Sequence, residues 1–275
     1  MPLERHLLKG ILNQYIEAIF HLTDFMPDHS IERVVPTGHV FIIFELDGFQ
    51  RSTYNNETLE PIATFREVWV SGMQKNHISI SAHQQSELFV IQFKAFGAFP
   101  FFHFPIQELN DSVISGKEVF GAEILALREE ILTRKTTEEK FQSAENWLLN
   151  RFRQDKIPPT DLLEVLEKLQ NEPVINSVEI FEGYSKSQKH LIDQFKKYVG
   201  LTPKYYQRML RFNEILRQIH QANKIEWAQV AYQMEYTDQS HFIKEFKHFS
   251  GINPQKFIQQ GFQEGTNFFP LDKKG

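Results

Sequence analysis

The clearest pattern of apolar and polar positions in the chain occurs twice, in residues 187–207 and again in residues 238–258, at a constant offset of 51 residues. Each copy carries three apolar residues spaced i, i+4 and i+7, which places them on one stripe of a helix that packs on a core. They are Leu191, Phe195 and Tyr198 in the first copy and Phe242, Phe246 and Phe249 in the second.

Each copy also carries the residues that begin and end a helix. Ser187 and Asp238 are favourable N-caps, and Gly200 and Gly251 follow as C-cap glycines. A capping residue with proline then starts a new helix in each copy, at Thr202-Pro203 and Asn253-Pro254. A long copy with its spacing intact indicates that one supersecondary unit occurs twice.

The outward face of each predicted helix is polar and mostly cationic, which suits a helix laid into the major groove of DNA. The candidates for reading bases are Ser187, Gln188, Lys189 and Asp193 in the first copy and Gln239, Ser240, His241 and Lys244 in the second. The candidates for phosphate contacts are Lys196, Lys197, Lys204, Arg208, Arg217 and Lys247. A solvated lysine and a histidine that only packs are the ordinary alternatives, and the Asp193 carboxylate can accept from cytosine but repels phosphate.

This layout resembles the C-terminal DNA-binding domain of the AraC/XylS family of transcription regulators, in which one long helix joins two helix-turn-helix units. The match runs from about Val174 to Gln260. The residues that carry it are Ser187 to Leu191 with Phe195 and Gly200, then Pro203, Tyr206 and Arg211, then Val230-Ala231, and then Tyr236 to Phe242 with Phe246, Gly251 and Pro254. Arg211 stands where the family keeps an arginine, and we expect it to form a structural ion pair.

The chain departs from the family pattern at three positions. Ser185 and Glu235 replace the glycine usual in the two turns, and Phe181 replaces a small residue of the first scaffold helix, which Asn176 and Glu179 should cap. From Pro203 to about Gln221 we expect the connecting helix, ~28 Å long at 1.5 Å per residue. That length is close to one DNA turn of ~34 Å, so both units could read one face of a duplex.

Short stretches rich in β-branched and aromatic residues indicate a sandwich or barrel in the N-terminal half. The predicted strands are His39–Leu46, Phe65–Val70, His77–Ala82 and Leu88–Phe93, while residues 15–22 fit a strand or part of a helical stripe. The aromatic stretch 97–105 is expected in the core. Residues from Phe25 to about Phe152 also resemble the sensory N-terminal domain of one AraC-type subgroup, which implies a cupin-like β-barrel followed by two helices and names no ligand.

The predicted fold class is therefore α+β, with a β-rich cupin-like barrel and two helices before an all-α domain of two helix-turn-helix units. The effector-sensing and dimerisation domain should span residues 1–153, with strands in about 15–105 and helices in about 117–153. Those helices begin at the capping pairs Ser115/Glu118 and Thr136/Glu139. A linker follows at 154–159, the DNA-binding domain at 160–262, and a loosely ordered tail at 263–275.

Charge supports a nucleic-acid footprint in one part of the chain. The net charge of the 275 residues is −5, yet residues 183–224 carry nine lysines and arginines against two acidic residues. Residues 225–264 carry three lysines and arginines against five acidic residues, so the second copy should contribute more to base readout than to general attraction of DNA. The chain has no cysteine, no signal-peptide core and no apolar run long enough for a membrane span, so a cytoplasmic protein is expected.

Three functions are compatible with these patterns. The first is a sequence-specific transcription regulator that binds double-stranded DNA, with RNA polymerase and a small-molecule effector as possible partners. The second is a metal-dependent cupin-type enzyme fused to a DNA-binding domain, and the third is a ligand-independent architectural regulator. We favour the first and expect no enzyme activity, cofactor or metal, because His39, His77, His83 and His103 lack the spacing of cupin ligands. A homodimer through residues 118–152 is also predicted.

Overall fold

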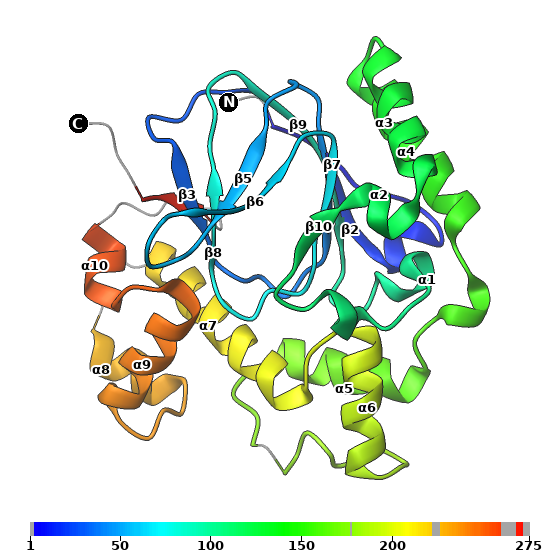
Figure 1. Cartoon of the computed structure of the whole chain (residues 1–275). Coiled ribbons are helices and arrows are strands. Elements are labelled where there is room, and N and C mark those ends of the chain that lie inside the picture. Colours follow the sequence, from blue (N-terminus) through cyan, green and yellow to red (C-terminus); the bar gives the residue numbers. More distant parts are fainter. Residues whose placement is uncertain (1–2, 177, 222–225, 260–267, 272–275) are drawn as a thin grey trace.

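The computed structural model describes residues 3–176, 178–221, 226–259 and 268–271, and its overall arrangement is seen in Figure 1. Two β-sheets occupy the N-terminal part and helices the C-terminal part, so the predicted α+β class is confirmed. No helix among the described residues is long and apolar enough to cross a membrane.

The first sheet has six antiparallel strands. Their order is β1 (Leu3–His6), β2 (Ile16–Phe25), β9 (Ser86–Phe93), β4 (Phe41–Glu45), β7 (Val68–Ser71) and β10 (Val113–Ser115). Buried and half-buried residues alternate along β9 from Phe89 to Phe93, and the strand interpretation of residues 15–22 is confirmed by β2. The register places Ile42 opposite both Ile91 and Val70, which builds one face of the core.

The second sheet has five antiparallel strands, in the order β11 (Phe268–Pro270), β3 (Ile31–Val34), β8 (Ile78–Ser81), β5 (Arg51–Tyr54) and β6 (Pro61–Phe65). The two sheets face each other, but in the described residues their edge strands do not pair, so the expected closed barrel is wrong and the strands form two open sheets. Strands β1 and β10 also lie outside the range in which strands were expected.

The predicted pair of helices covers the six-stranded sheet. The first predicted helix is divided at Gly121, whose φ is 72°, into α2 (Gly116–Phe120) and α3 (Ala122–Thr133), and the second is α4 (Thr137–Arg151). Thr136 and Glu139 form the predicted capping box. Both apolar stripes are buried inside the chain, and the Phe141 ring lies 5.7 Å from the Phe89 ring of the sheet. The stripes on which the homodimer prediction rested are therefore already covered.

Seven further helical elements lie outside the two sheets. They are η1 (Leu12–Gln14), α1 (Phe99–Phe102), η2 (Ile106–Leu109), η3 (Gln154–Lys156), α5 (Thr160–Asn171), α8 (Trp227–Gln233) and α10 (Pro254–Gln259). All four residues of α1 are buried, which confirms that the aromatic stretch belongs to the core. The duplicated motif folds as predicted into α6 (Gln188–Tyr198) and α9 (Gln239–Ser250), and α7 (Pro203–Gln221) joins the two units.

The predicted scaffold helix of the first unit does not form. Residues 178–183 are turns, and their backbone bonds run from i to i−3, as from the Phe181 N–H to the Val178 carbonyl at 3.1 Å. The Asn176 side chain does accept from the Val178 N–H, at 3.0 Å. A cap is thus present, but Gly183 with φ of 83° ends the segment before a regular helix develops.

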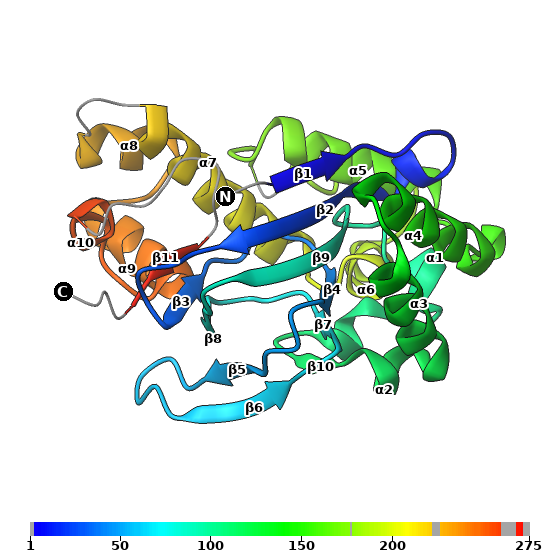
Figure 2. The same ribbon diagram turned by 90° about the horizontal axis from the view of Figure 1, so that it is seen from above.

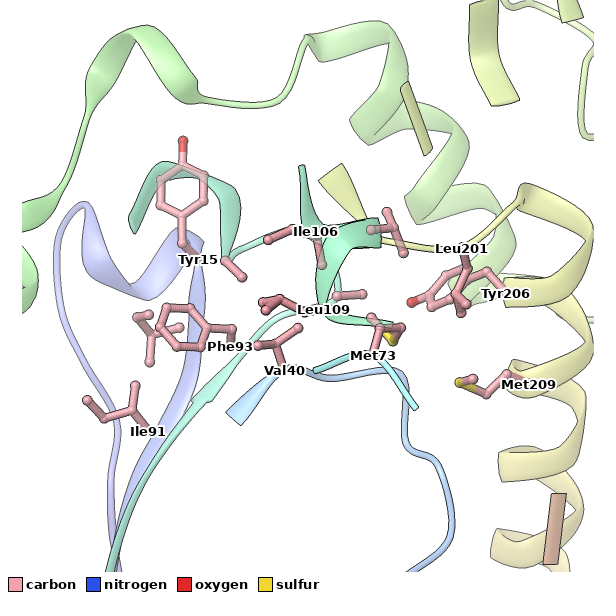
Figure 3. Close-up of a cluster of buried hydrophobic side chains, with 14 of the residues drawn as sticks. Tyr15, Val40, Met73, Ile91, Phe93, Ile106, Leu109, Leu201, Tyr206 and Met209 are labelled. Carbon is pink, nitrogen blue, oxygen red and sulfur yellow. The ribbon is translucent and has the colours of Figure 1, made fainter. Parts of the chain in front are cut away.

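One hydrophobic core runs through both parts of the chain. Figure 3 shows Met73, Ile106 and Leu109 of the N-terminal part beside Leu201, Tyr206 and Met209 of the C-terminal helices. The expectation of a loosely ordered tail is wrong for residues 268–271, since β11 pairs with β3 and Phe269 is buried. Residues 263–267 and 272–275 lie outside the described residues.

Candidate nucleic-acid interface

Helix α6 is built as its sequence predicts. The Ser187 hydroxyl accepts from the His190 N–H at 3.2 Å, which caps the helix, and Leu191, Phe195 and Tyr198 are buried. Gln188, Lys189 and Asp193 are exposed, so three of the four base-reading candidates have free side chains at the solvent face. His190 is held by the Tyr184 hydroxyl, 2.8 Å from its Nδ1, and this favours packing for that histidine.

Helix α9 repeats this construction. The Asp238 carboxylate accepts from the His241 N–H at 2.8 Å, while Phe242, Phe246 and Phe249 are buried. The four base-reading candidates of this copy, Gln239, Ser240, His241 and Lys244, are all exposed. An uncharged amide and a lysine on the first two turns of a helix are donors that can reach adenine and guanine edges in a major groove.

The turns that precede α6 and α9 each contain a residue with positive φ, although neither has glycine at the family position. Glu235 adopts a φ of 53° in the second unit, a left-handed conformation that costs a non-glycine residue about 1 kcal/mol. In the first unit Gly183, two residues before Ser185, supplies a positive φ. Both turns therefore form without glycine at the family position.

The phosphate candidates divide into free and engaged side chains. Lys204 and Lys247 are exposed and Lys196 is half-buried, whereas the Lys197 ammonium lies 5.0 Å above the Phe99 ring of the N-terminal part. Arg217 is exposed and forms a two-pronged pair with Glu214, at 2.8 and 2.6 Å. Their roles at DNA stay predictions.

Sequence reasoning missed Glu245, which is buried in α9 and gathers three partners. Arg208 Nε donates to its carboxylate at 2.8 Å, the Tyr236 hydroxyl donates at 2.9 Å, and Arg211 lies at 3.6 Å. Burial, together with the adjacent carboxylate, raises the pKa of Tyr236. The ion pair expected for Arg211 is confirmed, and Arg208, a phosphate candidate, has a structural partner in the free protein.

The structure brings the candidates together as two clusters, one on each recognition helix, and the two helices lie on either side of α7 (Figure 1). In Figure 2, too, α6 and α9 lie on opposite sides of α7. In both helices the exposed candidates begin at the first turn, whereas the C-terminal ends pack against the N-terminal part. The end of α6 contacts α1 and Asn110, and the end of α9 contacts β3 and His77. Two equivalent helices with free first turns are the arrangement that a bipartite reader of one duplex requires.

The four histidines weighed as metal ligands serve other contacts. His39 Nδ1 lies 2.8 Å from the Phe93 carbonyl, His103 Nε2 lies 3.1 Å from two carbonyls, and His83 stacks on Phe49. Burial, with Arg33 and His248 nearby, lowers the pKa of His77 to about 4. Across the described residues, no three His, Asp or Glu side chains are grouped as a metal site.

A cavity of about 50 Å³ lies between the two sheets. Its polar end is formed by Glu45, which accepts from Trp69 Nε1 at 2.7 Å and from Arg51 Nε at 2.8 Å. Burial raises the pKa of Glu45 to about 7. Arg51 Nη1 and His83 Nε2 are buried here without a hydrogen-bond partner, so the cavity offers two polar atoms to a bound molecule.

Comparison with family models finds two matches. Residues 182–260 match the model described as a helix-turn-helix domain, and residues 6–115 match a domain of unknown function (DUF6597). The search of the curated proteins finds no match.

Comparison with solved structures finds distant likenesses. ToxT from Vibrio cholerae is 10% identical with a TM-score of 0.47, over 88% of this chain and 98% of ToxT. A ToxT structure with a bound unsaturated fatty acid is 12% identical with a TM-score of 0.46, over 87% of this chain and 94% of that one. An AraC-type transcriptional regulator from Chromobacterium violaceum is 22% identical with a TM-score of 0.34, over 38% of this chain and 95% of that chain.

The helix-turn-helix match spans both recognition helices and the connecting helix, which are the elements that the duplicated motif predicted. The family resemblance and the geometry thus agree on the same residues. Residues 182–260 therefore form a helix-turn-helix domain of the AraC type.

Proposed function

We propose that this regulator recognises one specific duplex with α6 and α9 together, and that a small molecule bound by the N-terminal domain modulates that recognition. The observation that carries the proposal is the pair of equivalent helices, each with exposed polar side chains on its first turn and each tied to α7. Such a regulator acts in the cytoplasm, with double-stranded DNA as its partner and RNA polymerase as a further one.

The two units contribute differently to DNA binding. The first unit and α7 carry the excess of lysine and arginine, so they supply the attraction that any duplex experiences. The second unit has a net negative segment but exposes Gln239, Ser240 and Lys244, which suit base edges. The first unit and α7 therefore supply most of the anchoring, and the second unit adds discrimination.

The test is a pull-down of genomic fragments with the purified full chain, followed by sequencing. Enrichment of a shared motif, protected by the protein in footprinting, supports the proposal. Uniform recovery of fragments at every salt concentration contradicts it. A parallel pull-down with Lys189→Ala and Gln239→Ala tests whether the enriched motif depends on both helices.

The cavity between the sheets is our candidate effector site. Its aromatic wall includes Trp69 and Phe65, whose rings stack at 6.1 Å, and its polar end holds the unpartnered Arg51 and His83 atoms. A volume of about 50 Å³ is far below the 300–1,000 Å³ of ordinary ligand pockets. An effector is therefore very small, or the β5–β6 hairpin moves to admit it. That hairpin is joined to β8 by only two residue pairs and stands away from the rest of the sheet in Figure 2.

A thermal-shift screen of metabolites tests this site. A ligand that raises the unfolding temperature of the full chain but not of His83→Ala supports it, because binding to the native state alone stabilises that state. Ile62→Ala is the matched control, since Ile62 is exposed on β6 outside the cavity. A ligand that stabilises all three chains equally binds elsewhere and contradicts the assignment.

We also propose that the protein binds DNA as a homodimer. The stripes of α3 and α4 are buried internally, so the surface left for a partner copy is formed by outward residues of these helices, including Leu132 and Leu149. A dimer binds two copies of its target sequence, because the symmetry of an oligomer is mirrored in its sites.

A further inference from the structure

The N-terminal domain holds both recognition helices, and it does so at equivalent positions of the duplicated motif. Gly200 and Gly251, the C-cap glycines 51 residues apart, are both packed against it. A Cβ atom at Gly200 would lie 2.7 Å from Asn110 Oδ1, and one at Gly251 would lie 2.5 Å from His77 Cε1. Separations this short leave no space for a side chain at either glycine.

Hydrogen bonds fix the first unit at its glycine. Asn110 Nδ2 donates to the Gly200 carbonyl at 2.6 Å, and the ring of Tyr198, at the end of α6, lies 4.7 Å from the Phe99 ring of α1. Figure 3 shows that Leu201, just beyond this glycine, faces Ile106 and Leu109 of the N-terminal domain. The end of α6 therefore belongs to the shared core.

Hydrogen bonds also fix the second unit, with other residues. The His77 N–H donates to the Phe249 carbonyl at 3.1 Å, and Arg33 Nη1 donates to the Ser250 carbonyl at 3.3 Å. These carbonyls end α9, where helix carbonyls lack partners within the helix. The N-terminal domain thus supplies the missing donors from β3 and from the residue before β8.

The C-terminal strand strengthens this second attachment. β11 adds to the edge of β3, and the Leu271 N–H donates to the Ile31 carbonyl at 2.9 Å. The buried Phe269 ring lies 5.3 Å from Phe257 of α10 and 5.6 Å from the Arg33 guanidinium. The chain after the second unit therefore returns to the sheet that carries Arg33.

We propose that the N-terminal domain sets the separation and orientation of the two reading units, so that Asn110, Arg33, His77 and the β11 strand are positioning residues for DNA recognition. This inference rests on the proposed function. The reading side chains begin at the opposite end of each helix from the held glycine, and α6 and α9 are ~16–18 Å long. A tilt of about 10° at the held end would move a reading side chain by about 3 Å, enough to lose a base contact. The N-terminal contacts at the end of α9 therefore act together with the bond between Arg208 of α7 and Glu245 of α9.

We expect that weakening either attachment lowers the preference for one separation between the two recognised sequence blocks. The probe is a duplex library with a random core of about three helical turns, from which the full chain selects its targets. For the unchanged protein, we expect two sequence blocks at one separation, favoured about tenfold over separations two base pairs longer or shorter. Gly251→Ala and Asn110→Ala should each reduce that preference to below about threefold.

Gly48→Ala is the matched control. Gly48 has a φ of +78°, against +77° at Gly251, but no atom lies within 4 Å of its Cβ position. Both substitutions therefore carry the strain of a positive φ, and only Gly251→Ala strikes the N-terminal domain. Gly48→Ala should keep the tenfold preference.

The outcomes separate the two proposals. If the unchanged protein selects no sequence, the proposed function fails. If it selects two blocks and both variants keep the same separation and preference, the positioning role is wrong. Tighter binding by the variants at an unchanged separation also overturns it, because the attachments would then oppose DNA binding. Asn110→Ala involves no backbone strain, so it decides the matter if Gly251→Ala fails to fold.

Discussion

Arg208 and Glu245 join the connecting helix to the second recognition helix through a bond of 2.8 Å between Arg208 Nε and Glu245 Oε2. Glu245 is buried, and its other oxygen accepts from Tyr236. The pair locks the rotation of α9 relative to α7, since Glu245 lies on the inner side of the helix whose outer side carries Lys244. A residue that faces inward thereby fixes where the reading residues point.

Glu245→Ala should therefore destabilise the protein by about 3 kcal/mol, because it leaves Arg208 and Arg211 without their carboxylate. Urea unfolding of the full chain measures the loss. Glu214→Ala is the control, since Glu214 pairs with the exposed Arg217 and its removal should change stability little. Equal losses in the two variants would show that the buried network is not a special support of the second unit.

Lys189→Ala should cost about 1–3 kcal/mol on the specific duplex and relax the preference at one or two base positions. Lys189 is exposed on the first turn of α6, where a side chain can reach base edges. Affinities for the selected duplex and for a scrambled one measure the effect. If both fall by the same factor, Lys189 contacts only phosphate.

Lys196→Ala combined with Lys204→Ala should weaken binding to every duplex and flatten the slope of log K against log salt by about two. Lys9→Ala, which removes an exposed lysine of the N-terminal part, should leave the slope unchanged. An unaltered slope in the double variant would place the phosphate footprint elsewhere. The engaged candidates Lys197, Arg208 and Arg217 should show smaller slope changes, because their present partners compete with phosphate.

The stability of the N-terminal domain should depend on the ionisation of Glu45. Burial raises its pKa from 4.5 to about 7, so folding favours the protonated form. The stability that this proton contributes is fully present below pH 4.5 and is lost as the pH rises towards 7, at up to about 1.4 kcal/mol per pH unit. Glu45→Gln should therefore gain stability relative to the unchanged chain across this window. The measurement is the free energy of unfolding of both proteins between pH 4.5 and 7. A constant difference between them across this range would contradict the raised pKa of Glu45.

Light scattering tests the homodimer. At micromolar concentration we expect the mass of two chains, and Leu132→Glu with Leu149→Glu should give the mass of one. A single-chain mass for the unchanged protein, with and without a duplex, rules out the dimer.

The recognition helices could be predicted from sequence because caps, apolar spacing and glycines all agree there. The N-terminal strands were harder. Strand β3 reads as polar through Glu32 and Arg33, yet both are buried, one at the cavity wall and the other against α9 and β11. Such residues are explained only by partners far away in the chain. The prediction of a closed barrel was wrong for a similar reason. Whether two edge strands pair depends on residues far apart in the chain and leaves little local signal in the sequence.

The candidate site was likewise predictable only in part. Exposed residues on α6 and α9 could be named from the sequence, because the helical period assigns one face to the core and the other to solvent. Glu245 could not, since a carboxylate among Lys244, Phe246 and Lys247 looks like a surface residue until Arg208, Arg211 and Tyr236 are seen around it. The strand β11 lay in a segment whose composition suggested a loose tail.

The most direct test of the account is the specificity of Gln239→Ala combined with Lys244→Ala. We predict that the ratio of specific to non-specific affinity falls at least about tenfold while non-specific affinity is kept, because these side chains read bases and the first unit anchors the duplex. Gln233→Ala with Lys256→Ala removes the same residue types from exposed positions of α8 and α10 and should leave the ratio unchanged. If the first double variant loses both affinities in proportion, the second unit is an anchor and the division of labour is wrong.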